Sequence, residues 1–257
     1  MSEIHDAAQH GYSTEAASYT RGRPEYPAAL KSWLTKDIGI GAGTPVVDLG
    51  AGTGKFTRLL TAIGAAVTAI EPVDAMRDEL SRKLPAVRAL AGTADAMALP
   101  SGSFDAVLCA QAFHWFATQP ALSEIHRVLK PGASLGLVWN VRDEAVDWVA
   151  AITEIITPYE GDAPRFYKGD WRKPFDGRLF TQPALSTFSY SHVGSPQQVI
   201  IDRFLSVSFI AALPSDEKAH VAQRLQALID QHPALRGQSE VVFPYRTEAY
   251  SCQRLSS

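Results

Sequence analysis

The stretch at residues 45–55 constrains the fold of this chain more than any other part of the sequence. It reads PVVDLGAGTGK, so a short apolar run with an acid at position 48 leads into glycines at positions 50, 52 and 54. Apolar residues follow at helical spacing, at positions 56, 59, 60 and 63. This pattern predicts a buried strand, a tight glycine turn and a helix. Because glycine allows positive φ and a helix start offers unpaired N–H groups, we expect a ligand against this turn.

The charge of Asp48 limits the kinds of ligand that the turn can bind. A pyrophosphate beside this carboxylate would be repelled, whereas a ligand with an ammonium group or another positive centre would be held. The dinucleotide fingerprint is G-x-G-x-x-G, but here the spacing is G-x-G-x-G and Lys55 follows the third glycine. The residues therefore favour a cationic ligand. A nicotinamide-dependent oxidoreductase, and a generic loop without a ligand, stay open as alternatives.

This acid-plus-glycine turn resembles the first motif of class I S-adenosylmethionine-dependent methyltransferases. In that family the turn cradles the amino-acid end of S-adenosyl-L-methionine, which implies that this is the cofactor here. The resemblance assigns cofactor contacts to Asp48, Gly50, Ala51, Gly52 and Thr53.

A second resemblance lies further towards the N-terminus. Residues 19–27 read YTRGRPEYP, which is similar to the Y-x-x-x-R-P-x-Y-P signature of small-molecule methyltransferases related to trans-aconitate methyltransferase, in the methyltransferase type 11 group. In that group the segment folds over the cofactor. The resemblance implies that residues 1–27 form a covering arm, that Arg23 pairs with the methionine carboxylate, and that Tyr19 covers the sulfonium. The alternative is a surface arm with a solvated arginine.

The patterns that follow alternate between strand and helix. Helices are expected over 28–38, 53–63, 74–84 and 119–130, and strands over 45–49, 66–70, 87–91, 104–110 and 133–139. With the resemblance, they predict a single α/β domain: a Rossmann-like, seven-stranded, mostly parallel sheet with helices on both faces. Residues 28–142 would form its cofactor-binding core.

Two further segments are expected to hold the nucleoside. Glu71 ends the second strand 17 residues beyond Gly54, a spacing that suits an acid that binds ribose hydroxyls; the alternative is an exposed acid at a strand end. Residues 92–100 resemble the family's G-D-A-E-x-L-P segment, with a threonine where the family often has an acid that reads the adenine amino group. Which residue reads adenine stays open, and the alternative for Asp95 is that it only caps a helical turn. The expected nucleoside contacts are Glu71, Pro72, Met76, Thr93, Ala94 and Asp95.

The fourth strand ends at Ala110 and Gln111, which we expect beside the cofactor, and leads into an aromatic loop at 113–116. Ligands bind beyond the carboxyl ends of parallel strands, so this loop should lie over the reacting methyl group. It matches the family's H-W-F motif. His114 is the candidate for contacting the substrate or moving a proton; the alternative is a histidine that only packs beside its neighbour. The expected substrate pocket comprises Phe113, His114, Trp115 and Trp139.

The pattern is looser beyond residue 143. A helix is expected over 144–157, an irregular segment over 158–183, a strand over 188–193, and two helices over 197–232 separated at Leu213 and Pro214. Residues 241–254 should form a final strand or pair at the antiparallel edge of the sheet. The helical insertion at about 196–232 is placed to act as a lid over the substrate pocket.

Composition limits the function. The formal charge of −3 and the pI near 6.2 make nucleic acid an unfavoured partner, and no apolar run is long enough for a membrane span. The N-terminus lacks the apolar run of a secretory signal, and only two cysteines occur, with Cys109 expected to be buried, so we expect a cytoplasmic protein. No metal-ligand spacing is present.

The predicted function is S-adenosylmethionine-dependent methylation of a small molecule, at an oxygen of a carboxylate or hydroxyl, by a monomer or homodimer. The alternatives are the oxidoreductase and a non-methylating cofactor-binding protein or cyclase on the same fold.

Overall fold

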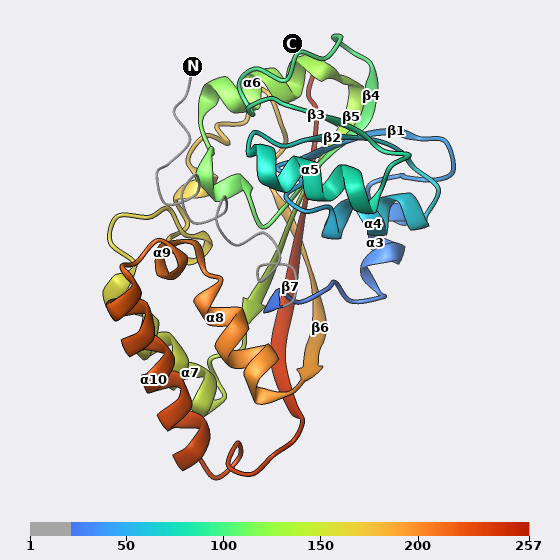
Figure 1. Cartoon of the computed structure of the whole chain (residues 1–257). Helices are drawn as coiled ribbons and strands as arrows, with labels where there is room; N and C mark the ends of the chain where they lie inside the picture. The colour runs from blue at the N-terminus through green and yellow to red at the C-terminus, as the bar shows by residue number, and fades with distance from the viewer. Residues whose placement is uncertain (1–21, 257) are drawn as a thin grey trace.

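The computed structural model describes residues 22–256 and builds them around one seven-stranded sheet (Figure 1). The strand order is β3-β2-β1-β4-β5-β7-β6. The first five strands are parallel and β7 is antiparallel to both of its neighbours, so the predicted mostly parallel sheet is confirmed. The strands are β1 (Pro45–Leu49), β2 (Ala66–Ile70), β3 (Arg88–Leu90), β4 (Phe104–Ala110), β5 (Leu129–Arg142), β6 (Ala184–Gly194) and β7 (Val241–Gln253).

Helices cover both faces of the parallel part. Successive residues of a strand point to opposite faces, so Val46 packs with the helices of one side and Val47 with those of the other. This explains why the sequence of these strands is apolar without alternation. The helices of this part are α3 (Leu30–Lys36), α4 (Lys55–Ala62), α5 (Asp74–Lys83) and α6 (Gln119–Val128), with a short 3-10 turn η1 (Phe113–Trp115). Cys109 is fully buried, as predicted.

The prediction for the last strand was wrong in one respect. Residues of β7 lie between β5 and β6, with Leu137 opposite Tyr250 and Tyr190 opposite Tyr245, so β6 and not β7 is the antiparallel edge. Burial explains the placement, because β7 is buried over most of its length whereas β6 exposes every second side chain.

A group of helices lies beside the lower parts of β6 and β7, at the lower left of Figure 1. We call it the helical lobe: residues 147–156 and 197–231, which belong to two insertions, one before β6 and one before β7. They share a core that includes Ile152, Phe204, Leu225 and Phe243. The lobe comprises α7 (Asp147–Ile156), the π-helix η5 (Gln197–Asp202), α8 (Arg203–Leu205), α9 (Ser208–Ala211) and α10 (Ser215–Gln231).

The predicted break at Leu213 and Pro214 is confirmed, because α10 begins at Ser215. The region before it is three short helices, η5, α8 and α9, and not the single helix that the sequence predicted. The segment expected to be irregular holds three 3-10 turns, η2 (Thr157–Tyr159), η3 (Phe166–Lys168) and η4 (Asp170–Arg172).

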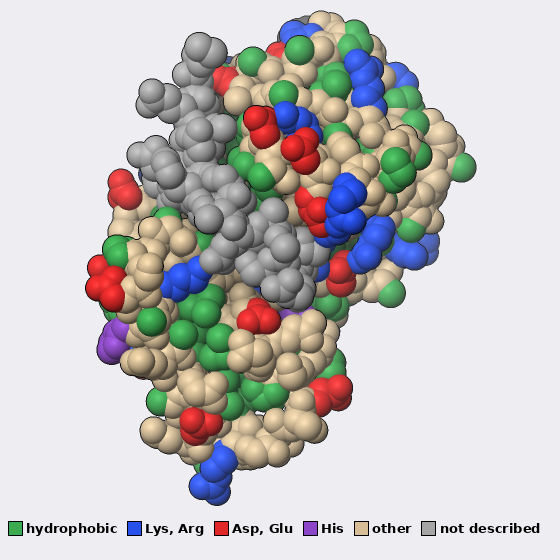
Figure 2. Space-filling view, in the orientation of Figure 1, with side chains coloured by type: hydrophobic (Ala, Val, Ile, Leu, Met, Phe, Trp, Pro, Cys, Tyr) green, Lys and Arg blue, Asp and Glu red, His purple; other side chains and the backbone are tan. Residues whose placement is uncertain are grey.

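Acidic and basic side chains lie close together over the sheet on the face that Figure 2 shows, in line with the small net charge. None of the helices within residues 22–256 has the length and apolar character that a bilayer span requires.

Candidate functional site

The turn after β1 requires glycine at three positions. Gly50, Gly52 and Gly54 have φ angles of 70°, 55° and 84°. A Cβ atom at position 50 would lie 2.8 Å from the Cβ of Ala112, and one at position 54 would lie 3.0 Å from Leu80. Glycine therefore brings the backbone of the turn itself to the wall of the cavity described below, which Gly50 and Gly52 line.

Asp48 lies directly below this turn and is 1% exposed. Its Oδ2 accepts a hydrogen bond of 2.5 Å from the Thr57 hydroxyl on α4, whereas its Oδ1 is buried and has no hydrogen-bond partner. Burial raises the pKa of Asp48 to about 7, and the nearby charge of Glu71 contributes in the same direction. The side chain lines the cavity at the turn. An unpartnered carboxylate oxygen in such a place suits a ligand that brings positive charge.

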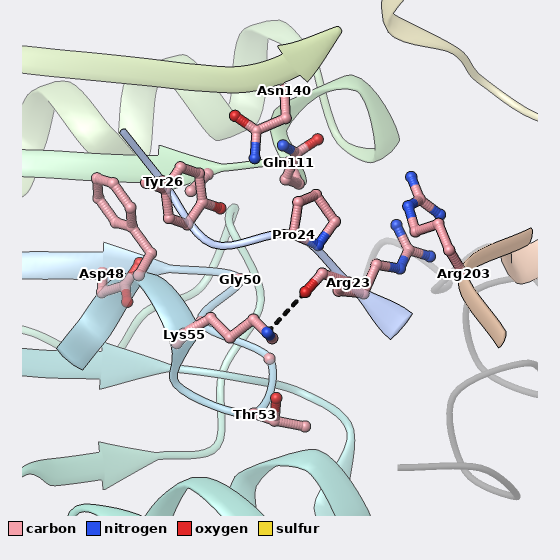
Figure 3. Close-up of a pocket in the computed structure, with 14 residues that line it drawn as sticks. Arg23, Pro24, Tyr26, Asp48, Gly50, Thr53, Lys55, Gln111, Asn140 and Arg203 are labelled. Carbon is pink, nitrogen blue, oxygen red and sulfur yellow. Dashed lines mark hydrogen bonds between the residues drawn. The ribbon is translucent and has the colours of Figure 1, made fainter. Parts of the chain in front are cut away.

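The cavity at the turn holds about 60 Å³ (Figure 3). It is formed by the segment before α3, the glycine turn, the ends of β4 and β5, and one residue of the lobe. Eight of the predicted cofactor residues line it. Its lining comprises Arg23, Pro24, Tyr26, Asp48, Gly50, Ala51, Gly52, Thr53, Lys55, Phe56, Ala110, Gln111, Asn140 and Arg203.

The segment at 22–26 is fastened over this turn. Lys55 donates through Nζ to the Arg23 carbonyl at 2.7 Å and to the Glu25 carboxylate at 2.9 Å. Asn140 donates to the Glu25 carbonyl, and Arg23 donates to the Ser206 carbonyl of the lobe, both at 2.9 Å. The segment thus joins the glycine turn, β5 and the lobe. Tyr19 lies outside the described residues.

Glu71 stabilises the turn in this structure. Its carboxylate accepts from the N–H of Gly52 at 2.8 Å and from the N–H of Val73 at 2.9 Å, and burial raises its pKa. Each carboxylate oxygen retains a second lone pair. The sulfur of Met76 packs 3.8 Å from the position of a Cβ at Gly52.

The remaining predicted nucleoside contacts lie beyond β2 and β3. Thr93 donates to Asp95 at 2.6 Å, Ala94 is buried, and Pro72 is half-buried. With Glu71 and Met76 they line neither the cavity at the turn nor the larger cavity described next, and their role towards a nucleoside stays a prediction.

A larger cavity of about 660 Å³ begins where the first one ends. The two have four lining residues in common: Arg23, Gln111, Asn140 and Arg203. Gln111 has a φ of 64°, an uncommon conformation for a residue other than glycine, and such residues concentrate at functional sites. The larger cavity is walled by β5, by the segment with η3 and by the lobe, whose Ile156, Val207 and Ser208 take part.

The aromatic loop after β4 reaches this larger cavity through His114 and Trp115. Trp139 donates from Nε1 to Nδ1 of His114 at 3.1 Å. Because Nδ1 accepts, a neutral His114 carries its proton on Nε2 and is a donor there. Burial, with the charges of Arg165 and Arg23, lowers its pKa to about 3. Phe113 lies in the core, fully buried, and does not line the cavity.

Sequence reasoning missed several lining residues. Asn140 and Arg142 follow the strand expected at 133–139, so the rule that ligands bind beyond strand ends was a usable signal for both. Lys55 directly follows the third glycine of the motif. Arg203 had no signal, because its position depends on the packing of a distant insertion.

Known proteins that are similar to this chain are methyltransferases. A family model described as a methyltransferase domain matches residues 47–137. An uncharacterized methyltransferase-like protein of Schizosaccharomyces pombe is 37% identical over 244 residues, which cover 95% of each chain. An uncharacterized methyltransferase of Mycobacterium tuberculosis is 38% identical over 236 residues, or 92% of each chain. The closer likeness to trans-aconitate methyltransferase stays a prediction.

Solved structures share the fold at low identity. The YcgJ protein of Bacillus subtilis superposes with a TM-score of 0.54 at 18% identity, over 88% of this chain and 98% of that one. Phosphoethanolamine N-methyltransferase 2 of Haemonchus contortus, solved with S-adenosyl-L-methionine, gives a TM-score of 0.58 at 13% identity, over 100% of this chain and 61% of that one. The chain belongs to the class I S-adenosylmethionine-dependent methyltransferases, and S-adenosyl-L-methionine is its cofactor.

Proposed function

We propose that this enzyme methylates a carboxylate oxygen of a small organic acid that enters the larger cavity. The observation that carries the proposal is the state of His114, which lines this cavity as a neutral hydrogen-bond donor and not as a base. A carboxylate is already ionised near neutral pH, so it needs no base and benefits from a donor that orients it.

The glycine turn fits the amino-acid end of the cofactor. The turn presents bare backbone, and the unpartnered Oδ1 of Asp48 is placed to attract the ammonium group. Arg23 would bind the methionine carboxylate, and Glu71, with its remaining lone pairs, would accept from the ribose hydroxyls. Gln111 and Asn140 line both cavities, so the reacting methyl group belongs near them.

Bound S-adenosyl-L-methionine supplies a methyl group on positively charged sulfur; the acceptor oxygen bonds to the methyl carbon as the carbon–sulfur bond breaks and leaves its electron pair on sulfur. The chain's contribution is to position the acceptor. His114 would donate from Nε2 to the acceptor carboxylate, and Trp139 keeps the imidazole in that tautomer. The indole rings of Trp115 and Trp139 offer an aromatic wall on which positive charge is stabilised.

The names of two partial relatives support transfer to oxygen. The O-methyltransferase cnsE of Penicillium expansum is 36% identical over 122 residues, and the malonyl-[acyl-carrier protein] O-methyltransferase of Serratia marcescens is 30% identical over 126 residues. They cover 43% and 46% of this chain, respectively.

The test is a transfer assay with labelled S-adenosyl-L-methionine and matched libraries of organic acids, alcohols and amines, with products identified by mass spectrometry. We expect methyl esters of acids, whose label is released by mild alkali. Alkali-stable ethers or methylamines as the main products would contradict the proposal. A different result would assign the histidine as a base. In that case only alcohols would give labelled product, and the acid limb of the pH–rate profile would disappear in a His114→Asn variant.

A further inference from the structure

The larger cavity has an excess of positive charge. Five arginines line it, at positions 23, 142, 165, 203 and 246, against three acids, Asp143, Glu144 and Glu160. His114, which also lines it, is neutral because of its low pKa. The whole chain is acidic, so this concentration of arginines is local and does not reflect composition.

Arg203 is the most unusual of the five. It begins α8 directly after the π-helix η5, a type of segment that is frequent at functional sites. Its Nε donates to the Tyr245 hydroxyl at 3.3 Å, but its Nη1 is buried and has no hydrogen-bond partner. Figure 3 shows its guanidinium beside that of Arg23. A buried cationic donor without a partner is costly unless a ligand completes it.

Arg142 and Arg203 both lie against one buried ring. The Cζ atoms of Arg142 and Arg203 lie 5.5 Å and 5.4 Å from the centre of the buried Phe204 ring. Arg142 pairs with the Glu144 carboxylate at the long distance of 3.6 Å. Burial, together with the positive charges of Arg23 and Arg142, lowers the pKa of Arg203 to about 10, so Arg203 stays charged at neutral pH. The fold therefore brings the positive charges of Arg23 and Arg142 near that of Arg203, and Glu144 and Glu160 offset this repulsion at Arg142 and Arg165.

We infer that the acceptor is a dianion: one carboxylate is methylated near His114, and a second anionic group is held in the larger cavity by Arg142 and Arg203. This inference rests on the proposed function. The guanidinium forks of two arginines suit the two oxygens of a carboxylate. Arg142 lines only the larger cavity, which separates this anion site from the cofactor's own carboxylate at Arg23. The volume suits a small organic acid.

The experiment compares acceptors that differ only in the second charge. Succinate, glutarate and adipate are each assayed against their half-amides, in which one carboxylate is replaced by a neutral amide of similar shape. We expect kcat/KM for at least one dicarboxylate to exceed that of its half-amide by at least about tenfold. Equal kcat/KM for every pair would overturn the inference while leaving methyl transfer to a carboxylate intact.

Variants of Arg142 then test whether this residue causes the preference for dicarboxylates over half-amides. Arg142→Gln should raise KM for the preferred dicarboxylate by at least about tenfold, change kcat and the half-amide little, and leave the Kd for S-adenosylhomocysteine unchanged in calorimetry. Arg142→Lys should recover part of the preference, since it keeps the charge but loses the fork. Arg178→Gln, at an exposed arginine paired with Asp176 and remote from both cavities, is the control and should match the parent enzyme. An equal loss for both acceptors in Arg142→Gln would contradict the assignment.

A binding measurement separates this inference from the proposed function. Glutarate is titrated calorimetrically into the protein saturated with S-adenosylhomocysteine, and glutaramate into a second sample. Tighter glutarate binding without any methyl transfer would support the dianion site and contradict the proposed reaction. If Arg142→Gln does not fold, Arg203→Lys provides the same comparison, because it retains the charge and removes the fork.

Discussion

The two halves of the site bind by different means. At the glycine turn the contacts come from backbone that three glycines leave bare, and the one charged group below it is a carboxylate, Asp48. In the larger cavity the candidate contacts are long cationic side chains, two of which, Arg142 and Arg203, lie against one ring. The cofactor half is thus specified by local conformation, and the acceptor half by side chains that only the tertiary fold brings together.

The largest expected effect concerns the backbone half. Gly50→Ala combines a φ of 70° with a Cβ 2.8 Å from Ala112, so we expect the free energy of unfolding to fall by about 2–4 kcal/mol. Gly132→Ala is the matched control, because its φ is 73° and nothing lies within 4 Å of the added Cβ. Gly132→Ala should lower the free energy of unfolding by about 1 kcal/mol. Urea unfolding of both variants measures the difference, and equal losses would show that close packing at the turn is unimportant.

The second prediction concerns Asp48. Its folded pKa of about 7 exceeds the ordinary aspartate value of 3.8, so the native state binds more protons than the unfolded state between these values. The free energy of unfolding therefore falls as the pH rises from about 4 to 7. Asp48→Asn removes this loss and should stabilise the fold at pH 8 by about 1–3 kcal/mol, after the cost of an unpaired amide is counted.

The same substitution should weaken cofactor binding by about 1–3 kcal/mol at pH 8, because it removes the charge that faces the ammonium group. In the parent enzyme a cationic ligand favours the ionised form, so affinity should fall as the pH drops below about 7. Calorimetry across pH 6–8.5 tests both statements. A variant that gains stability and keeps its affinity would show that Asp48 does not bind the cofactor.

A smaller effect is expected where the segment at 22–26 joins the turn. Lys55→Met removes two donated hydrogen bonds from a side chain that is 18% exposed, and should weaken cofactor binding by about 1 kcal/mol. The control is Arg58→Gln. Arg58 also pairs with Glu25 but is 62% exposed, so its loss should change little. Equal effects of the two variants on the Kd would indicate a role for the charge of Glu25 alone.

The smallest expected effect tests whether His114 acts as a neutral hydrogen-bond donor. Since its pKa is about 3, kcat/KM measured at saturating cofactor should show no inflection from this group between pH 5 and 8. Trp139→Phe removes the donor that fixes the tautomer and should lower kcat/KM by about fivefold, at one hydrogen bond of about 1 kcal/mol. An acid limb near pH 6.5 that is lost in His114→Asn would contradict the neutral-donor assignment.

This contrast also explains how much of the fold and of the site could be predicted from the sequence. The glycine turn, Asp48 and the strand ends at Ala110 and Gln111 were predictable, because each depends on residues that are neighbours in the chain. The order of β7 and β6 was not, since strand patterns do not state which partner lies on which side. No signal in the sequence indicated that Arg203 would line the site. Its place beside the glycine turn arises from the packing of the lobe core and not from any local pattern.

The insertion of β7 between β5 and β6 has a consequence for biosynthesis. Neither the edge strand nor the lobe core, which includes Phe243 and Tyr245, can be completed until residues 241–253 have left the ribosome. During translation the helical lobe and the edge strand can be completed only after β7 has been made, whereas the five parallel strands can pair with one another earlier. Nascent chains paused between residues 195 and 240 should therefore be the ones most in need of chaperones.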